Sequence, residues 1–445
     1  MQASVEHLNR LLTSEGPQTS SQIQQRLGIS QPTASRLIQR AGESIARIGR
    51  GRSSLYARIR SDFGNTRLPI YTINALGHHA QIASLIPLSG GGYLVEGEAL
   101  QPYLLGHHGS GLFEDLPYFL QDSRPQGYLG RRLARQLSAT YPENPEQWSS
   151  DHIIRYLIDH GSDLPGNLIL GDVARARLNN TPITGISHRA THYPALAEQA
   201  IHGELPGSSA GGEQPKFTSY SEDRGHVIVK FSPAGSAPAD VRWRDLLIAE
   251  YLAANTIANF GMPSAESLLH SFDSRIFLES RRFDRQGQHG RKPMISLLMV
   301  HAEFVGSSGN WIDACEPLVK QKRLNHADFQ QVLWLHHFGQ WIGNSDMHLG
   351  NLSLTPSADG FTLLPAYDML PMRYAPSAQG EIPERGYEVP LMRAGHHQVW
   401  KDSGVAAIEF WRQVEGESLI SEDFKAIARK IGSDIQIAIN VEAQG

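Results

Sequence analysis

Apolar positions three and four residues apart predict a group of short helices at the start of the chain. The first spans residues 4–14, the second begins at a capping Ser20 and stops at Gly28, and the third is capped by Ser30. Residues 45–58 then alternate apolar and polar positions around a Gly-Arg-Gly tip, which predicts a β-hairpin. Short helices followed by a hairpin indicate a winged helix-turn-helix.

Beyond this module the pattern switches between the period of a strand and that of a helix. Residues 61–200 are the least regular, with a strand-like run at 82–88 and a helix-like run at 151–162. The clearer runs further on predict strands at 226–231, 275–285 and 352–354 and helices at 240–259 and 332–341. The mixture indicates an α+β protein of two or three domains.

Charge divides the chain unevenly. Residues 1–60 contain nine arginines, no lysine and three acids, a net charge of +6. Because the whole chain carries −5, the remainder carries −11. A small basic module is thus joined to an acidic body, which favours nucleic acid as a partner of residues 1–60.

The start of the third helix and the hairpin supply the predicted DNA contacts, at base edges and at phosphates. A second interpretation is a small helical domain with a solvated basic face, used for dimerisation. The residues predicted to contact DNA are Gln31, Thr33, Ser35, Arg36, Arg40, Arg47, Arg50 and Arg52.

Residues 342–351, IGNSDMHLGN, hold an Asp and an Asn five positions apart, Asp346 and Asn351. In kinase catalytic loops an Asp and an Asn at this spacing orient the substrate hydroxyl and hold Mg²⁺. Asp368 follows after a strand and a turn, where a kinase places its main metal-binding carboxylate. Read alone, the stretch is also an ordinary turn, since Gly, Asn, Ser and Asp favour turns.

Lys230 lies in the apolar run 226–231, where a lysine is costly unless an anion pairs with it. In the kinase plan such a lysine holds ATP phosphates and is itself held by an acid on the next helix. Glu250 is the preferred partner and Asp245 the alternative. The simpler interpretation is a lysine that extends along the strand to solvent.

Residues 206–217 are rich in small residues and could cradle phosphate, although a plain surface turn is equally consistent with them. The loop lacks the Gly-Lys-Ser/Thr ending of a Walker A motif. The strand at 275–285 occupies the place of a hinge that pairs with adenine. Glycine-rich loop, strand lysine, acidic helix, hinge strand, Asp…Asn loop and second Asp thus follow in kinase order.

These stretches resemble the HipA-like serine/threonine kinases, the toxin halves of bacterial toxin–antitoxin pairs. The resemblance covers residues 65–430 and depends on SSAGGEQPKF, HVIVK, RRFDR, IGNSDMHLGN and AYDML. It implies a two-lobed kinase fold with an all-helical C-lobe. The winged helix-turn-helix predicted at the start of the chain is not part of the usual toxin and would be fused ahead of this kinase. The expected parts are a DNA-binding domain at 1–62, a HipA-type N-terminal subdomain at 63–205, a nucleotide-binding core at 206–284 and the C-lobe at 285–445.

The resemblance also implies roles for matching residues. Asp346 would be the catalytic acid or base, and Asn351 and Asp368 the Mg²⁺ ligands. Ser208, or Ser209 beside it, would be autophosphorylated, which would eject the loop and disable ATP binding. His348 could contact phosphate or bond to the backbone, and the structural role is preferred. The implied ATP-binding residues are Ala210, Gly211, Gly212, Glu213, Lys230, Arg281, Arg282, Phe283 and His348.

Two departures from the family pattern affect the site. Pro215 precedes Lys216, which leaves the register of the loop open by one residue. Arg281 and Arg282 lead into the hinge phenylalanine where an acid is common. Because the adenine contacts there come from backbone groups, this second departure bears on affinity more than on activity.

The expected cofactors are ATP and Mg²⁺, and the expected partners a protein substrate with a Ser or Thr acceptor and DNA bound through residues 1–60. A separate antitoxin or a homodimer is a further possibility. Two rival hypotheses are a nucleotide-sensing DNA-binding regulator without phosphotransfer, and a metal-dependent DNase using Asp346, His348 and Asp368. One cysteine, no signal peptide and no apolar run of about 20 residues favour the cytoplasm, at the nucleoid if DNA is bound, and no membrane partner.

Overall fold

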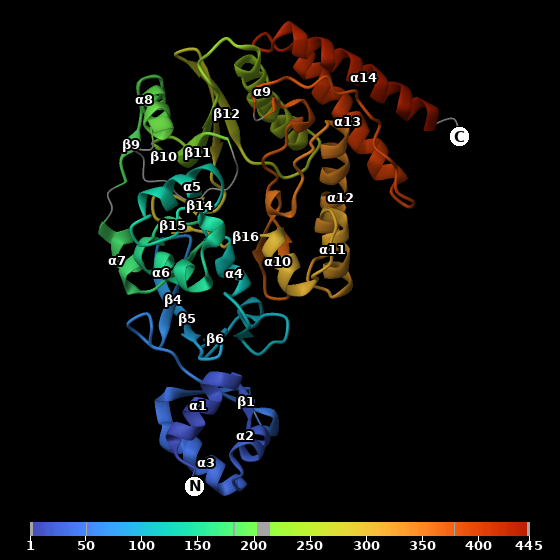
Figure 1. The fold of residues 1–445 in the computed structure, drawn as a ribbon. Coiled ribbons are helices and arrows are strands. Elements are labelled where there is room, and N and C mark those ends of the chain that lie inside the picture. Colours follow the sequence, from blue (N-terminus) through green and yellow to red (C-terminus); the bar gives the residue numbers. More distant parts are fainter. Residues whose placement is uncertain (1–2, 50, 181–182, 203–213, 378, 443–445) are drawn as a thin grey trace. The chain divides into compact units, whose positions relative to one another are not determined.

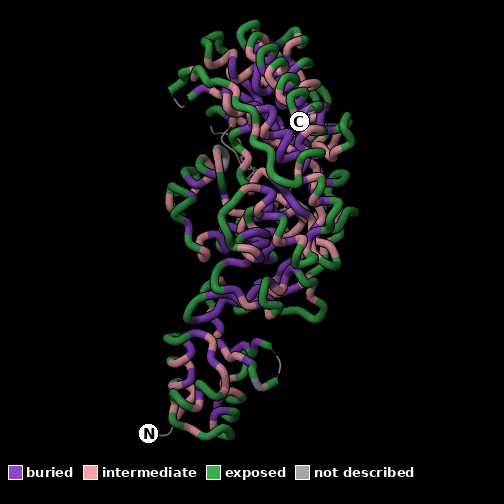
Figure 2. Tube along the Cα trace, turned by 90° about the vertical axis from the view of Figure 1, so that its right-hand side faces the viewer, coloured by how far each residue is buried: buried purple, intermediate pink, exposed green. Residues whose placement is uncertain are grey.

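The computed structural model describes residues 3–49, 51–180, 183–202, 214–377 and 379–442. The protein is a mixed α/β chain that divides into two compact units (Figure 1). The N-terminal unit comprises Met1–Asn74, His78–Arg124 and Gln147–Thr181, and the C-terminal unit Ala75–Gly77, Pro125–Glu146 and Pro182–Gly445. In the tube of Figure 2, buried positions line the inside of each unit and exposed ones the outer turns.

The first 60 residues form three helices and a three-stranded sheet of order β1-β3-β2 around Leu8, Leu12, Ile23 and Leu37. The elements are α1 (Val5–Glu15), β1 (Gln18–Thr19), α2 (Ser20–Leu27), α3 (Gln31–Ala41), β2 (Ile45–Ile48) and β3 (Leu55–Arg58). The N-terminal caps of α2 and α3 differ from those that the sequence predicted.

Thr19, not Ser20, caps α2, because Gln22 N donates to the Thr19 hydroxyl while the Gln22 side chain accepts from Thr19 N. Ser30 precedes α3 as expected, but its hydroxyl makes no cap bond and lies 3.0 Å from the Thr33 hydroxyl instead.

A second sheet, of order β7-β6-β5-β4-β8, completes the N-terminal unit. Its strands are β4 (Leu68–Ile73), β5 (His79–Pro87), β6 (Tyr93–Glu96), β7 (Leu112–Phe113) and β8 (Leu168–Leu170), with helices α4 (Tyr118–Gln121), α6 (Ser150–His160) and α7 (Asp172–Asn180).

The two sheets of this unit share one hydrophobic core. Ile48 and Ile59 pack in the same buried cluster as Ile86 and Leu88 of the second sheet. Backbone bonds continue the contact, since Ser89 N donates to Arg58 O at 2.7 Å and Arg60 N to Pro87 O at 2.9 Å. Residues 1–60 are therefore not tethered by a free linker but packed on the sheet that follows them.

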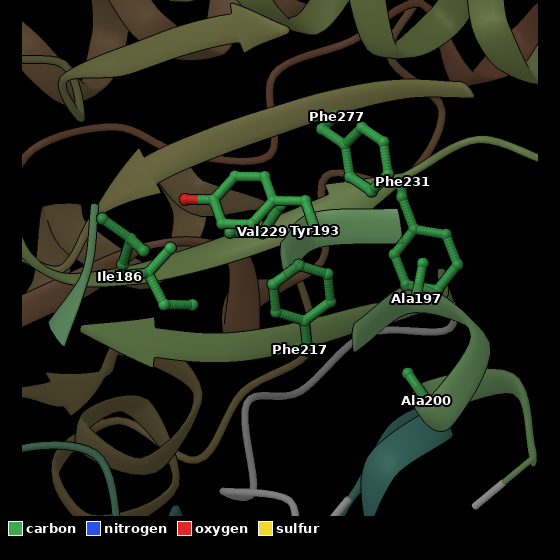
Figure 3. Packing of buried hydrophobic residues seen from close by; sticks show 9 residues of the cluster. Ile186, Tyr193, Ala197, Ala200, Phe217, Val229, Phe231 and Phe277 are labelled. Atoms are coloured by element: carbon green, nitrogen blue, oxygen red, sulfur yellow. The ribbon is translucent and has the colours of Figure 1, made fainter. Parts of the chain in front are cut away.

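The C-terminal unit begins with a five-stranded sheet of order β12-β13-β11-β10-β9. Its strands are β9 (Gly185–Ile186), β10 (Lys216–Ser221), β11 (Gly225–Phe231), β12 (Ser267–Phe272) and β13 (Arg275–Arg281). α8 (Arg189–His202) covers one face through an aromatic cluster that includes Tyr193, Phe217 and Phe277 (Figure 3). α9 (Pro238–Asn259) lies on the other face, where it places Glu250 beside Lys230.

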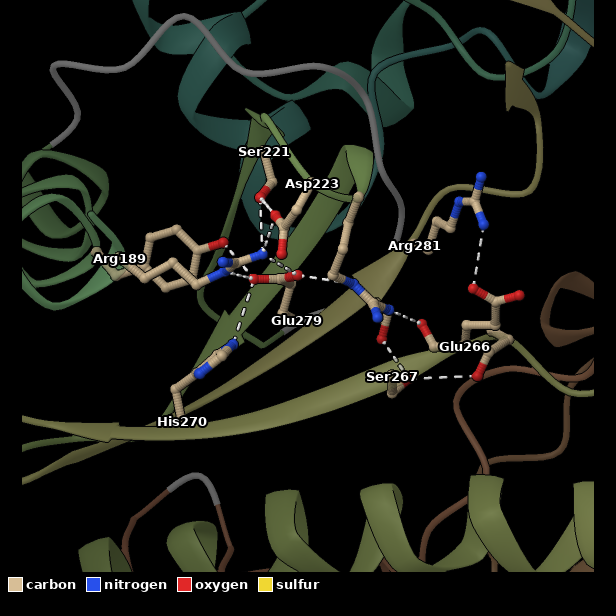
Figure 4. A network of polar contacts seen from close by, with 12 residues as sticks. Arg189, Ser221, Asp223, Glu266, Ser267, His270, Glu279 and Arg281 are labelled. Carbon is tan, nitrogen blue, oxygen red and sulfur yellow. Dashed lines mark hydrogen bonds and ion pairs between the residues drawn. The ribbon is translucent and has the colours of Figure 1, made fainter. Parts of the chain in front are cut away.

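A buried acid also holds α8 to the sheet. Glu279 of β13 is fully buried and accepts from Arg189 Nε at 2.5 Å and from the Tyr193 hydroxyl at 2.6 Å (Figure 4). Burial raises the pKa of Glu279, but hydrogen bonds from His270, Arg189 and Tyr193 outweigh it and lower the pKa to about 2. The acid is therefore ionised and fastens α8 to the sheet.

The rest of the C-terminal unit is mostly helical, but the expectation of an all-helical C-lobe is wrong. A small sheet of order β16-β17-β18 pairs the segment before α10 with the strands that follow residue 351. Buried backbone groups must find partners, and strand pairing satisfies those of Ile295, Ser353 and Leu354 here. The elements are α5 (Gly127–Gln136), β14 (Arg285–Gln286), β15 (Gly290–Arg291), β16 (Ile295–Ser296), α10 (Leu297–Phe304), α11 (Trp311–Lys320), α12 (His326–Trp341), β17 (Ser353–Pro356), β18 (Phe361–Leu363), α13 (His397–Gly416) and α14 (Glu422–Glu442).

Across the described part of the chain, every helix is too short or too polar to cross a bilayer.

Candidate active site

Lys230 forms the centre of the site. Its Nζ lies 2.6 Å from Glu250 Oε1 and 2.6 Å from Asp368 Oδ1. Lys230 and Glu250 are buried, and among the described residues Glu250 Oε2 has no hydrogen-bond partner. The alternation of side chains along β11 explains why Lys230 points toward α9. Its neighbour Val229 packs in the cluster under α8, so the Lys230 side chain lies on the opposite face of the sheet. One lysine therefore joins the sheet, α9 and the segment after β18.

Electrostatics favour a charged Lys230. Burial lowers its pKa, but attraction to Asp368 and Glu250 outweighs this, so its pKa is raised overall. Burial likewise raises the pKa of Asp368, and attraction to Lys230 outweighs it and leaves that pKa lowered. For Glu250 burial prevails and its pKa is raised. Asp368 is thus the more strongly ionised of the two partners, which suits an acid that binds a cation.

Hydrogen bonds link the backbone of Asp346, in the loop after α12, to the backbone of Asp368. Asp346 N donates to Asn344 Oδ1 at 3.0 Å, and Asn344 Nδ2 donates to Asp368 O at 3.4 Å. Asn351 Nδ2 donates to Asp346 O at 2.7 Å, which leaves its amide oxygen available for a ligand. Asn344, which sequence reasoning missed, is buried and links the two acids.

His348 is held by the backbone. Gly350 N donates to His348 Nδ1 at 3.0 Å, and Trp311 Nε1 donates to His348 O at 2.9 Å. An electrostatic contribution from His348 also helps to lower the pKa of Asp368. Trp311 of α11 therefore supports the loop, a role that no sequence pattern indicated.

Asp368 has a backbone φ of 55°, in the left-handed region that non-glycine residues seldom adopt. Such strain persists only where surrounding contacts outweigh it, and it gathers at functional sites. Here Asn344 holds the Asp368 carbonyl, and the hydroxyl of the preceding Tyr367 donates to Gly350 O at 2.9 Å. Asp368 is therefore oriented by both its neighbour and the loop that carries Asp346.

The three predicted hinge residues are placed differently. Arg281 forms an ion pair with Glu266 at 3.2 Å on the outer part of the sheet (Figure 4). Arg282 is buried and donates to both oxygens of Asp284 at 2.9 Å. Only the Phe283 ring lies beside the site, with its centroid 5.8 Å from that of Tyr367.

The glycine-rich loop lies outside the described residues, and with it Ser208, Ser209, Ala210, Gly211, Gly212 and Glu213. Lys216, the first residue of β10, is buried and pairs across the strands with Lys230. Its charge lowers the pKa of Asp368 and of Glu250. Lys216 is thus a second cation of the site, and the sequence signalled it only by its position after the loop.

Asp245, the alternative partner of Lys230, lies elsewhere. Its carboxylate accepts from Ser421 N at 2.9 Å and from the Ser421 hydroxyl at 2.6 Å. Glu250, five residues further along α9, is the acid at Lys230.

The described side chains of the residues predicted to contact DNA are exposed or partly exposed. Gln31, Ser35, Arg36, Arg40 and Arg47 are exposed and Thr33 is partly exposed. Arg47 Nε donates to the Ser54 hydroxyl at 3.2 Å. Arg50 and the side chain of Arg52 lie outside the described residues.

Comparison with known proteins gives matches along most of the chain. Residues 64–179 match the family model of the YjjJ-like toxin middle domain, and residues 208–439 match that of the HipA-like C-terminal domain. Toxin YjjJ of Escherichia coli K12 is 35% identical over 432 residues, which cover 95% of this chain and 96% of that protein.

Among solved structures, HipA of Shewanella oneidensis, in a complex with HipB and operator DNA, superposes with a TM-score of 0.54 at 14% identity. The match covers 84% of this chain and 96% of that one. The Helicobacter pylori proinflammatory kinase CtkA gives a TM-score of 0.38 at 14% identity over 52% of this chain and 90% of CtkA, a likeness too weak to bear on the fold.

Proposed function

The chain belongs to the HipA-like toxin family, in its YjjJ-like branch, and we propose on this premise that it is an ATP- and Mg²⁺-dependent protein serine/threonine kinase. The observation that carries the proposal is Lys230, held between Glu250 and Asp368 and linked through Asn344 to Asp346. Phosphoryl transfer needs these elements together, because its catalysis is mostly positioning and charge stabilisation.

The donor set of the site suits Mg²⁺. Asp368 offers its second carboxylate oxygen and Asn351 its amide oxygen, and Mg²⁺ prefers oxygen ligands. When bound, the ion would supply positive charge that offsets the negative charge developing during transfer. Asp368 and Asn351 are the residues that would hold it.

The chain's own residues account for the remaining steps. Lys230 and Lys216 would bind ATP phosphates, and Asp346 would orient the Ser or Thr hydroxyl and accept its proton. The hydroxyl oxygen forms a bond to the γ-phosphorus as the bond to the β,γ-bridging oxygen breaks, which leaves ADP. We extend the proposal to autophosphorylation at Ser208 or Ser209, which would remove the loop from the nucleotide.

Residues 1–60 are proposed to bind DNA as a winged helix-turn-helix, with α3 as the recognition helix and β2–β3 as the wing. The exposed arginines of α3 and Arg47 of β2 support this. The solved HipA structure contains HipB and operator DNA as separate partners. In this chain residues 1–60 would themselves bind DNA, with or without a separate antitoxin. A homodimer would match DNA sites made of paired half-sites.

Incubation of the purified protein with γ-³²P-ATP, Mg²⁺ and cell extract tests the proposal. We expect labelled Ser or Thr sites, including Ser208 or Ser209, and loss of label with EDTA. Asp346→Ala and Asp368→Ala should abolish transfer, whereas Asp359→Ala, an exposed acid in the β17–β18 turn, should not.

Two results would favour the rival functions. A gel shift that responds to ATP without any phosphotransfer would point to a nucleotide-sensing regulator. Plasmid nicking that survives Lys230→Ala but not Asp346→Ala would point to a metal-dependent DNase.

A further inference from the structure

We infer that Asp245 and Arg242 are positioning residues, which fasten α9 to the segment after Asp368 and to the start of α14 and so hold Glu250 at Lys230. The inference deepens the proposed function and rests on it, because Lys230 is there the residue that binds ATP phosphates. It also gives Asp245 a role distinct from that of Glu250.

The first contact is a buried carboxylate at the end of another helix. Asp245 is 1% exposed. Both of its oxygens are used, Oδ1 by Ser421 N at 2.9 Å and Oδ2 by the Ser421 hydroxyl at 2.6 Å. Ser421 directly precedes α14, and its hydroxyl also accepts from Phe424 N at 3.3 Å. Asp245 therefore joins α9 to the first turn of α14, 176 residues away in the sequence.

The second contact comes from the neighbouring turn of α9. Arg242 is buried, and its NH1 donates to Tyr374 O at 3.1 Å. Its guanidinium also lies over the Phe424 ring, 4.9 Å from the centroid. Tyr374 follows Asp368 by six residues, so Arg242 ties α9 both to α14 and to the segment that carries the predicted metal ligand.

The geometry of α9 explains how the contacts of Arg242 and Asp245 fix the position of Glu250. Arg242 and Asp245 are three residues apart and lie on one side of α9, whereas Glu250 is five residues from Asp245 and turned away from it by about 140°. Because α9 is a continuous helix of 22 residues, two fixed points on one side set its rotation and its axial position. Glu250 Oε1 then stays within 2.6 Å of Lys230 Nζ.

The geometry excludes a direct role for these residues in the reaction. Asp245 and Arg242 meet Ser421, Phe424 and Tyr374 rather than Lys230, Asp346 or Asp368. Their effect on catalysis is therefore indirect, through Glu250 for Asp245, and through Glu250 or the segment after Asp368 for Arg242.

The test is a double-mutant cycle on the affinity of the full chain for Mg²⁺–ATP, measured by calorimetry. We expect Asp245→Ala to weaken binding about tenfold and Glu250→Gln to weaken it by a similar factor. If Asp245 acts through Glu250, the double variant should bind no more weakly than Glu250→Gln alone. Ser418→Ala, an exposed serine of the same α13–α14 link, is the matched control and should bind like the wild type.

Gentler variants keep the test decisive where Asp245→Ala fails to fold. Asp245→Asn retains an acceptor for Ser421 N, and Ser421→Ala removes only the hydroxyl. We expect each variant to bind Mg²⁺–ATP about threefold more weakly than the wild type. Additive losses in the cycle, or unchanged affinity in Asp245→Ala and Ser421→Ala, would overturn the positioning role alone. A wild-type chain that binds no ATP would overturn the proposed function as well.

Discussion

At the scale of single residues, the site depends on one lysine that must remain charged inside the protein. Lys230 has two carboxylate neighbours at 2.6 Å, so removing its charge leaves the buried Glu250 and the partly buried Asp368 without compensation. Breaking a buried pair in this way costs far more than the pair itself contributes, because the remaining charge keeps its desolvation penalty.

Lys230→Met should therefore lower the free energy of unfolding by about 3–5 kcal/mol, measured by urea titration at pH 7. Lys320→Met is the control, because Lys320 forms an exposed pair with Glu316 that is worth less than about 1 kcal/mol. Equal losses in the two variants would contradict the central place of Lys230.

Two adjacent histidines of α12 predict a pH dependence of stability. Burial lowers the pKa of His336 to about 3 and that of His337 to about 4. Unfolded, both would titrate near 6.5. Between these values the unfolded chain binds more protons, so stability is complete above pH 6.5 and falls as the pH drops towards 4.

The slope should be about 1.4 kcal/mol per pH unit for each histidine, followed by thermal or urea unfolding from pH 7 to 5. The double variant His336→Gln/His337→Gln should flatten this slope. His397→Gln, at an exposed position, is the matched control and should leave the slope unchanged. A slope that the double variant leaves intact would rule out these two histidines as its source.

At the scale of elements, the hairpin β2–β3 has a buried apolar face and an exposed face. Its apolar side chains complete a core with β5 and β6, while Arg47 remains on the outside. Alternation along a strand allows this, since neighbouring side chains point to opposite faces. A hairpin that is packed on the following sheet should unfold together with it.

Ile59→Ala and Ile86→Ala should each lower the free energy of unfolding by about 2–5 kcal/mol, as buried side chains of this size do. Hydrogen exchange should then show β2, β3, β5 and β6 losing protection together. The reference is Ile437→Ala, at a side chain that is 59% exposed. Retained protection in β2–β3 beside a destabilised β5–β6 would show two separate cores.

At the scale of the whole molecule, charge is distributed by module. The basic first 60 residues are joined to a body of net negative charge, which would repel DNA and confine the proposed DNA binding to the module. The strength of such binding depends on salt through the counterions that arginines displace.

Arg36→Ala and Arg40→Ala should each weaken DNA binding and reduce the slope of log K against log salt by about one. Fluorescence anisotropy with a labelled duplex over a salt series measures both quantities. Arg412→Ala, an exposed arginine of α13, should change neither. An unchanged slope in the α3 variants would indicate that this surface serves protein contacts instead.

What the sequence determined by itself was local or depended on order. Periodicity placed α1, α2, α3, α6, α9 and α12 and some of the strands, but it predicted no helix at α8, α13 or α14. A lysine in an apolar strand indicated a paired charge, and the spacing of Asp346 and Asn351 indicated kinase chemistry. These motifs also carried the resemblance to the HipA-like family, which the comparisons confirmed.

The tertiary structure decided which groups meet. It placed Glu250 at Lys230 and Asp245 at Ser421, put Asn344 between two acids and buried the hairpin on the next sheet. These contacts join residues far apart in the chain, and one stretch of helix offers several acids whose side chains differ only in direction. Direction depends on how helices and sheets pack, because a rotation of about 100° per residue sends each acid to a different neighbour.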